Sequence, residues 1–164
     1  MSGVSTFAPV RRSVTVSAPV ERAFGIYTAD YGRWYPKEHF IGAGPAETVV
    51  IEPYPGGRWY EKQPDGSEPE WGRVLVWQPP HRLVLSWTVG GDWKHDPDPA
   101  HASEVEVRFS PVGPDRTLVE LEHRGIERHG GGAASIHGGV SDDDYGHAFY
   151  LRRFAAAAEG RPVG

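Results

Sequence analysis

The chain contains no cysteine in its 164 residues, and it has no long apolar run. The absence of cysteine excludes disulfide bonds and thiol chemistry. No stretch approaches the roughly 18 apolar residues of a membrane-spanning helix, so we expect none. The segment from Met1 to Pro9 has neither a basic start nor an apolar run, so we also expect no signal peptide. A cytoplasmic protein is the resulting expectation.

Positive charge is also scarce. The chain has 17 Lys and Arg residues against 22 Asp and Glu residues, which gives a net charge of −5. No basic run or stripe interrupts this balance, so the sequence argues against nucleic acid as a partner. It argues equally against electrostatic docking on an anionic membrane.

Aromatic residues are plentiful, with six Trp, seven Tyr and six Phe. One interpretation is a core built from large side chains. The other is that several of these rings line a ligand pocket, where they supply contact area with little loss of entropy. The length predicts a single domain over residues 1–164, with a structured core of about 10–160.

The hydrophobic periodicity predicts an α+β protein. Alternation typical of strands covers residues 10–16, 47–52, 58–63, 70–77, 82–89, 103–111 and 117–123. Helical spacing begins at Val20 and ends near Gly32, and a short helical piece follows at 33–35. The expected order is therefore β-α-α, six strands and a C-terminal helix. Hairpin turns between the strands indicate an antiparallel sheet, whose concave face the last helix would cover.

Helix starts are predicted at two serines. Ser17 precedes Pro19 and is expected to cap the first helix. Ser141 precedes three aspartates and is expected to begin a final helix over 141–158. The glycine-rich segment 125–140 is expected to be mobile, because glycine is the residue that costs most to order.

Glu61 is the first candidate functional residue. Side chains alternate along a strand, so Glu61 enters the interior if Trp59 does. A buried carboxylate must be paired or must lie in a polar cavity. The sequence leaves three interpretations open: a pocket carboxylate, an ion pair with an arginine such as Arg73 or Arg124, or an exposed residue if a bulge shifts the alternation.

His123 is the second candidate. It shares the alternation of Val119 and Leu121, which assigns it to the apolar face. The structural interpretation is a core histidine with a carboxylate or backbone partner. The functional one is a polar group in a cavity beside Glu61, where the two could transfer a proton.

No cofactor or metal is expected. The eight histidines include no pair at a known zinc spacing, and Asp92, Asp96 and Asp98 lack the other residues of a calcium loop. The glycine pairs and triplets do not form a phosphate-binding motif.

Several short motifs occur in a characteristic order and carry a family resemblance. They are Ser17-Ala18-Pro19-Val20 with Ala23-Phe24, Arg33-Trp34-Tyr35-Pro36, Gly56-Gly57-Arg58-Trp59, Trp71-Gly72-Arg73-Val74, Pro79-Pro80-His81-Arg82-Leu83 leading to Ser86-Trp87, Ser103-Glu104-Val105 with Phe109-Ser110-Pro111, and Thr117 through Glu122-His123. Together they resemble the START-like (SRPBCC, birch-pollen-allergen-like) superfamily. Within it, the chain is similar to the branch of the C-terminal domain of the heat-shock-protein-90 ATPase activator.

The resemblance implies a helix-grip fold, in which a curved antiparallel sheet surrounds a long C-terminal helix with a cavity between them. Similar sequences often open that helix with Gly-Trp, where this chain has Tyr145-Gly146. The residues expected around the cavity are Trp34, Phe40, Trp59, Glu61, Trp71, Trp87, Phe109, His123, Tyr145 and Phe149. Trp93, in a long polar loop, is expected to be a lid residue or an exposed loop aromatic.

Three functions remain open from the sequence. The leading one is binding of a hydrophobic or amphipathic small molecule in the cavity. The second is a cyclase, dehydratase or hydrolase that uses Glu61 and His123 as an acid–base pair. The third is a protein-interaction role, either co-chaperone-like in a stress response or as a regulatory partner. A homodimer is also compatible with the sequence.

Overall fold

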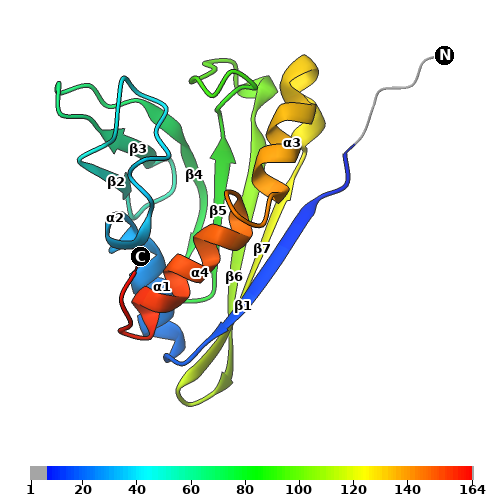
Figure 1. Ribbon diagram of the computed structural model, residues 1–164. Helices are drawn as coiled ribbons and strands as arrows, with labels where there is room; N and C mark the ends of the chain where they lie inside the picture. Colours follow the sequence, from blue (N-terminus) through cyan, green and yellow to red (C-terminus); the bar gives the residue numbers. More distant parts are fainter. Residues whose placement is uncertain (1–6, 164) are drawn as a thin grey trace.

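A seven-stranded antiparallel sheet curves around the helices in the computed structural model, which describes residues 7–163 (Figure 1). The strands are β1 (Val10–Val16), β2 (Thr48–Ile51), β3 (Arg58–Lys62), β4 (Glu70–Gln78), β5 (Arg82–Trp87), β6 (Ser103–Gly113) and β7 (Arg116–Arg124). Their order across the sheet is β1-β7-β6-β5-β4-β3-β2, so only β1 pairs with a strand distant in the sequence. The expectation for Met1 to Pro9 lies mostly outside the described residues.

Helices lie on the concave side of this sheet. They are α1 (Val20–Thr28), α2 (Tyr31–Trp34), α3 (Ala133–Ser141) and α4 (His147–Ala158), with short 3-10 turns η1 (Pro99–His101) and η2 (Ile126–Gly132). α4 crosses the sheet near α1, as Figure 1 shows. The α+β helix-grip fold predicted from the sequence is confirmed.

The strands form where the alternation predicts them. In β6, Val105, Val107 and Phe109 are buried on the inner face. Glu106 on the outer face is also buried, because three arginines cover its carboxylate. The seven expected strands all exist, with ends that differ by at most a few residues.

The C-terminal helix is shorter than predicted. Ser141 is the last residue of α3, and its hydroxyl donates to the His137 carbonyl oxygen at 2.6 Å instead of capping a new helix. The Asp142 carboxylate accepts the N–H groups of Asp144 and Tyr145, at 2.8 and 3.1 Å. These bonds form a turn that separates α3 from α4, so the serine and acids that resemble a helix start belong to a connection.

The glycine-rich segment is also different from the expectation. Residues 126–141 form η2 and α3 rather than an irregular segment. Gly139 lies against the indole of Trp93, where a Cβ atom would approach the ring to 2.8 Å. Gly132 similarly lies against the backbone of Gly91. These glycines allow close packing, and the mobility expected for the segment stays a prediction.

The start of α1 has no serine cap. Pro19 is the N-cap residue of α1, and Ser17 instead donates its backbone N–H to the Glu159 carboxylate at 2.8 Å. This contact ties the chain after β1 to the end of α4. Ser17 therefore helps to hold α4 on the sheet.

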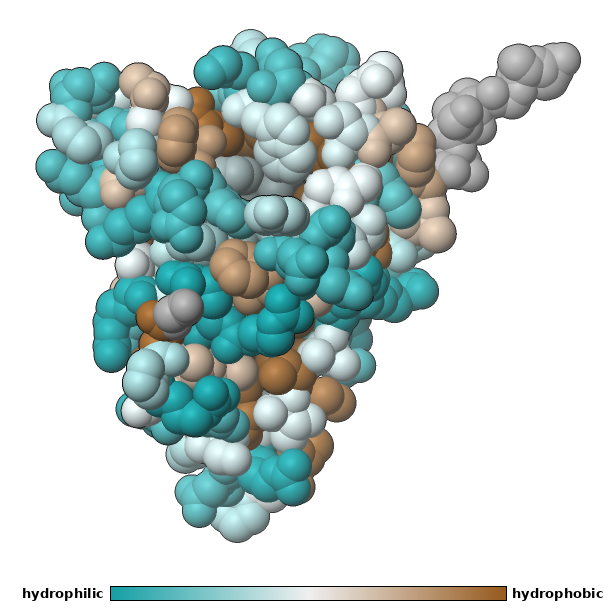
Figure 2. Space-filling model, in the orientation of Figure 1, coloured by the Kyte–Doolittle hydropathy of each residue, from teal (hydrophilic) through white to brown (hydrophobic). Residues whose placement is uncertain are grey.

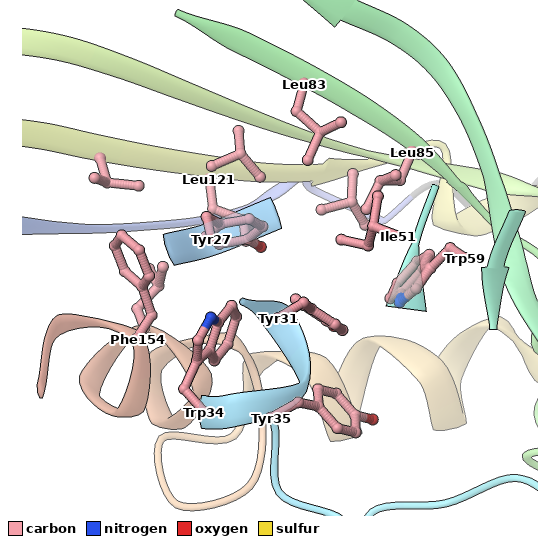
Figure 3. Packing of buried hydrophobic residues seen from close by; sticks show 14 of the residues in the cluster. Tyr27, Tyr31, Trp34, Tyr35, Ile51, Trp59, Leu83, Leu85, Leu121 and Phe154 are labelled. Atoms are coloured by element: carbon pink, nitrogen blue, oxygen red, sulfur yellow. The ribbon is translucent and has the colours of Figure 1, made fainter. Parts of the chain in front are cut away.

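The core lies between the sheet and the helices. Figure 3 shows Tyr27 of the first helix below the sheet, with Trp34 of α2 and Phe154 of α4 beside each other and Tyr31 next to them. Trp34 and Phe154 are essentially inaccessible to solvent. Their rings meet edge to face at 5.6 Å, a favoured geometry for aromatic pairs.

The outer surface is predominantly hydrophilic on the face in Figure 2, where hydrophobic residues occur in separate patches. Among the described residues, no helix combines the length and the apolar character needed to cross a bilayer.

Candidate functional site

A small internal cavity of about 20 Å³ lies between the sheet and the helices. The sheet contributes Trp59, Trp71, Leu85, Trp87, Val105 and Leu121 to its lining. The helices contribute Tyr27, Tyr31, Trp34, Tyr35, His147, Tyr150 and Leu151. This volume has room for about one water molecule. The site is therefore an aromatic chamber that its own side chains nearly fill.

Three tryptophans from neighbouring strands form one wall. Trp59, Trp71 and Trp87 come from β3, β4 and β5, and each points to the inner face of the sheet. Trp59 and Trp71 are stacked with centroids 5.8 Å apart, and Trp71 meets Trp87 edge to face at 5.1 Å. The wall presents flat π faces, which suit a flat aromatic ligand.

The indole N–H groups of the chamber differ in their hydrogen-bond partners. Those of Trp34 and Trp87 donate to the carbonyl oxygens of Ile26 and Val89, at 2.9 and 3.0 Å. That of Trp71 donates to Glu61 at 2.8 Å. The Nε1 atom of Trp59 is buried and makes no well-aligned hydrogen bond among residues 7–163, although it lies near enough to the Tyr31 hydroxyl to oppose the rise in the pKa of that residue. An unpaired buried donor costs about 1–3 kcal/mol, so it marks a position where an acceptor is missing.

Glu61 is buried, as the alternation with Trp59 predicts, even though the β3–β4 pairing has an irregularity next to it. One oxygen accepts the Ile41 N–H at 2.7 Å and the Trp71 indole N–H. The other accepts the Gly42 N–H at 3.2 Å and the Gln63 amide at 2.7 Å. These four donors match the lone pairs of a carboxylate. Glu61 thus fastens the segment before β2 to the sheet, and it does not line the chamber.

Neither arginine considered for Glu61 reaches it. Arg73 bonds to Glu70 at 2.9 Å. Arg124 bonds to Glu104 and Glu106 on the outer face. The buried carboxylate is therefore stabilised by hydrogen bonds from neutral donors and not by an arginine, which corrects the ion-pair interpretation.

His123 is completely buried and begins a polar chain of a different kind. Its Nδ1 lies 3.0 Å from Nε2 of His147, which lines the chamber. Its Nε2 lies 2.7 Å from the Ser103 hydroxyl. The same hydroxyl lies 2.7 Å from Nε2 of His129. The four side chains thus form a continuous line of hydrogen bonds that starts at the chamber wall.

Burial keeps these histidines uncharged. It lowers the pKa of His147 to about 3 and that of His123 well below its ordinary value. Arg12 adds to the effect on the pKa of His147, and the neighbouring histidines add to the effect on the pKa of His123. The pKa of His129 is also lowered by burial, more weakly. Neutral imidazoles can each accept one hydrogen bond and donate another.

Tyrosine hydroxyls define the end of the chamber near the surface. The Tyr35 hydroxyl donates to the His39 carbonyl oxygen at 2.9 Å, and the Tyr150 hydroxyl lies 2.8 Å from His39 Nδ1. Burial raises the pKa of both tyrosines. Both phenols therefore remain protonated and can donate hydrogen bonds.

The structure brings together only part of the predicted site. Trp34, Trp59, Trp71 and Trp87 line the chamber, and His123 contacts His147 from behind the wall. Phe109 lies deeper, against Phe24 and Tyr27.

The other predicted aromatics lie at the surface. Phe40 and Tyr145 are 37% and 66% exposed. Phe149 is half-buried beside His39. These three do not contribute to the lining.

Glu61 and His123 do not meet. Trp71, which holds Glu61, packs against Trp87, and Trp87 packs against His123 at 5.1 Å. Two indoles therefore separate the supposed acid–base pair, and the partner of His123 is His147.

Sequence reasoning missed several lining residues, most of them on helices. Tyr31 and Tyr35 are four residues apart, and His147, Tyr150 and Leu151 follow the i, i+3, i+4 spacing of one helix face. That spacing was the available signal. Ser103 gives no signal, because a serine at a strand end is ordinary.

The outer face and the acidic and histidine side chains offer no second candidate site in the described residues. A cleft of about 640 Å³ on the outer face is lined mainly by charged residues, including Glu106 and Arg108, that are engaged in ion pairs. Hydrogen bonds from Arg82, Arg124 and Arg108 overcome the effect of burial and lower the pKa of Glu106 to about 2. In the part of the chain that the structure describes, no group of three or more His, Asp or Glu side chains could hold a metal ion.

Comparison with known proteins gives the family. Residues 17–142 match the family model described as activator of Hsp90 ATPase homolog 1-like protein. No curated protein matches the chain.

Solved structures give a consistent result. The anthrahydroquino-gamma-pyrone synthase Txn09 is 42% identical, with 92% of this chain and 96% of that chain covered and a TM-score of 0.66. The self-sacrificing resistance protein CalC from Micromonospora echinospora is 31% identical, with 92% and 93% covered and a TM-score of 0.67. CalU16 from the same organism is 23% identical, with 94% of this chain and 84% of that chain covered. It shares the fold, with a TM-score of 0.57.

The family match spans most of the chain, and the architecture agrees with it. The chain therefore belongs to the activator of Hsp90 ATPase homolog 1-like family, within the START-like superfamily.

Proposed function

We propose that the chain binds a flat aromatic molecule of hydrophobic or amphipathic character in the chamber. The observation that carries this proposal is the Trp59 indole N–H, which is buried at the chamber wall and makes no well-aligned hydrogen bond in the described residues. A carbonyl or hydroxyl oxygen on the ligand would supply that acceptor. The ligand rings would lie against the neighbouring indoles and tyrosines.

The relatives support the same ligand class. Txn09 is named as a synthase of an anthrahydroquinone-linked γ-pyrone, which is a flat polycyclic molecule with several oxygen acceptors. Its 42% identity extends over nearly the full length of both chains. An aromatic chamber with one free donor has the chemistry to hold such a molecule.

Binding requires the chamber to open, because small-molecule sites occupy about 300 Å³ or more. The sheet is fixed by its hydrogen-bond ladder, whereas α2 has only four residues. α2 is joined to α4 by the Arg153 guanidinium, which donates to the Trp34 carbonyl oxygen at 2.7 Å. We infer that the ligand enters by displacing Tyr35 and Tyr150, which lie between the chamber and half-buried His39.

Calorimetric titration with a dihydroxyanthraquinone tests the binding proposal. Wild-type protein should bind this probe, and Trp59→Phe should bind it about five- to tenfold more weakly through loss of one hydrogen bond. Trp77→Phe is the matched control, because Trp77 packs against Phe24 away from the chamber, and it should bind like the wild type. Absence of binding to the wild type, or an equal loss in both variants, would contradict the proposal.

Ring closure by dehydration is the second candidate function, and His147 favours it. Its neutral imidazole lines the chamber, and Nε2 is occupied by His123, so Nδ1 is the nitrogen left to accept a proton from a ligand. In γ-pyrone formation, a phenol oxygen bonds to a ketone carbon of a β-diketone, and the ketone oxygen leaves as water. The phenol proton and one C–H proton are removed, and two protons reach the departing oxygen.

Conversion of ortho-hydroxybenzoylacetone to methylchromone, followed by absorbance, tests this chemistry. The wild type should accelerate the closure, and His147→Leu should lower kcat by about 100-fold, the usual contribution of a general base. A wild-type rate equal to the rate in buffer would rule the cyclase function out.

A further inference from the structure

The hydrogen-bonded line from His147 does not end inside the protein. It runs through His123 and Ser103 to His129, which belongs to η2 and borders an open cleft of about 550 Å³. Asp96 and Lys94 border the same cleft. The line therefore connects the chamber wall with a surface depression.

Both ends of this line are open. Nδ1 of His129 is buried and has no hydrogen-bond partner within residues 7–163. Nδ1 of His147 is not used by His123. A purely structural network would be expected to pair the buried Nδ1 of His129, since an unpaired buried group is costly.

Two arrangements of hydrogens satisfy every internal bond of the line. In one, His147 donates to His123, His123 to Ser103, and Ser103 to His129, which leaves a lone pair on His147 Nδ1 and a proton on His129 Nδ1. In the other, every donor is reversed, so the proton is on His147 Nδ1 and the lone pair on His129 Nδ1. The two arrangements differ by one proton moved from one end to the other.

We propose that His123, Ser103 and His129 form a proton relay between His147 in the chamber and the cleft beside Asp96. This proposal rests on the cyclase-type function, to which it adds the path of the protons. When His147 accepts a proton at Nδ1, its Nε2 proton passes to His123, and each following group passes on its own. A proton leaves His129 Nδ1 toward the cleft that this residue borders, which requires water to reach this buried nitrogen during turnover, and no imidazole remains charged.

The protons removed and delivered in one turnover return the hydrogen-bonded line to its starting arrangement. Removal of the phenol proton runs the relay outward and leaves a proton on His147 Nδ1, so the next step must run it inward by delivering a proton to the ketone oxygen. Removal of the C–H proton and delivery of the second proton to the departing oxygen repeat this pair of steps. After one turnover, the substrate has lost one water molecule and the hydrogens of the four side chains are in their original arrangement.

The surroundings of His129 suit a proton exit. Asp96 lies close enough for its charge to favour protonation of His129, while charged His101 opposes it. Asp96 itself accepts a hydrogen bond from His101 at 2.8 Å. These groups keep the exit polar without closing the line, because neither of them bonds to His129.

Turnover of ortho-hydroxybenzoylacetone by His129→Ala and Ser103→Ala tests the relay. Both variants should lower kcat by 10- to 100-fold with KM nearly unchanged, since neither residue lines the chamber. Added imidazole should restore the rate of His129→Ala in a concentration-dependent manner, but not that of Ser103→Ala. His137→Ala, at another half-buried histidine of the same region, is the control and should match the wild type.

Nitrogen NMR of the imidazoles gives a readout that is independent of activity. In the wild type, the His123 nitrogens should resonate at values averaged between their protonated and unprotonated limits. In Ser103→Ala, the line is cut and they should resonate at the values of a single tautomer. Ser103→Thr retains the hydroxyl and should restore the averaging.

The outcomes separate the relay from the function on which it rests. If the wild type turns over the diketone and both alanine variants match it, the relay is overturned and the cyclase function stands. If the wild type has no turnover, the cyclase function fails, and the NMR result decides the relay. A single His123 tautomer in the wild type, unchanged in Ser103→Ala, would overturn it.

Discussion

Two buried polar clusters lie at opposite sides of the tryptophan wall, and they are built differently. The Glu61 carboxylate receives four donors, two of them backbone N–H groups, and no donor or acceptor in this cluster faces the chamber. The His123 cluster is a line of side chains with an unpaired nitrogen at His129 and with His147 at the chamber wall. Glu61 and His123 themselves exclude solvent to a similar degree.

The difference lies in closure rather than in burial. A closed set of hydrogen bonds fixes a segment of chain and has no capacity left for a ligand. An open line can exchange a proton at each end. Judged by burial alone, Glu61 and His123 are equally good functional candidates. Their hydrogen-bond partners indicate a structural role for Glu61 and a role in proton transfer for His123.

The largest expected effect is on the closed cluster. Glu61→Ala removes the acceptor of Ile41, Gly42, Gln63 and Trp71 at once, and each of these buried donors loses its bond. We expect the free energy of unfolding to fall by about 4 kcal/mol, measured by urea denaturation.

Glu47→Ala provides the comparison for this variant. Glu47 is exposed just before β2, on the same side of the sheet, and its loss should change stability by less than about 0.5 kcal/mol. A loss below about 1 kcal/mol for Glu61→Ala would mean that water replaces the carboxylate, and the cluster would then not be closed.

The His123 cluster should make the stability of the protein depend on pH. The pKa of His147 is about 3 in the folded protein and about 6.5 in the unfolded chain. Between these values only the unfolded chain binds the proton, so stability is lost as the pH falls below about 6.5. By pH 5 the loss due to His147 is about 2 kcal/mol, and His147→Leu should remove this part while the part due to His123 remains. Urea denaturation at pH 7 and pH 5 measures the change.

His101 supplies a control of opposite sign. Its hydrogen bond to Asp96 raises the pKa of His101, so this residue stabilises the protein below its unfolded pKa and loses that contribution as the pH rises. His101→Leu should therefore make the protein more sensitive to acid, not less. If His147→Leu keeps the pH dependence of the wild type, His147 is not held neutral and the contrast with Glu61 fails.

Most of the sheet could be predicted from the sequence, because one buried face imposes a period of two. β6 illustrates this with Val105, Val107 and Phe109. The C-terminal region could not be predicted, because its local sequence patterns are compatible with more than one structure. The acids after Ser141 serve a turn, and Gly139 makes room for Trp93 rather than for motion.

The site was predicted in part for the same reason. The tryptophans of the wall lie on strands, where alternation gives the direction of a side chain. The line through His123 depends on which residues from β6, η2 and α4 meet it in space. Ser103 and His129 lie 26 residues apart in the chain, and no local pattern connects them.

The smallest expected effect concerns Tyr145, which the sequence placed at the cavity. Its ring is 66% exposed in the turn before α4, 6.2 Å from the ring of His39, and its backbone N–H donates to Asp142. Tyr145→Phe removes a hydroxyl that water already solvates, so stability should change by less than about 0.5 kcal/mol and affinity for dihydroxyanthraquinone should not change. Tyr150→Phe, which removes the hydroxyl bonded to His39 at the chamber, should by contrast alter that affinity. If Tyr145→Phe had the larger effect on binding, the ligand would lie outside the chamber, against the surface aromatics Phe40 and Phe149, and neither buried cluster would touch it.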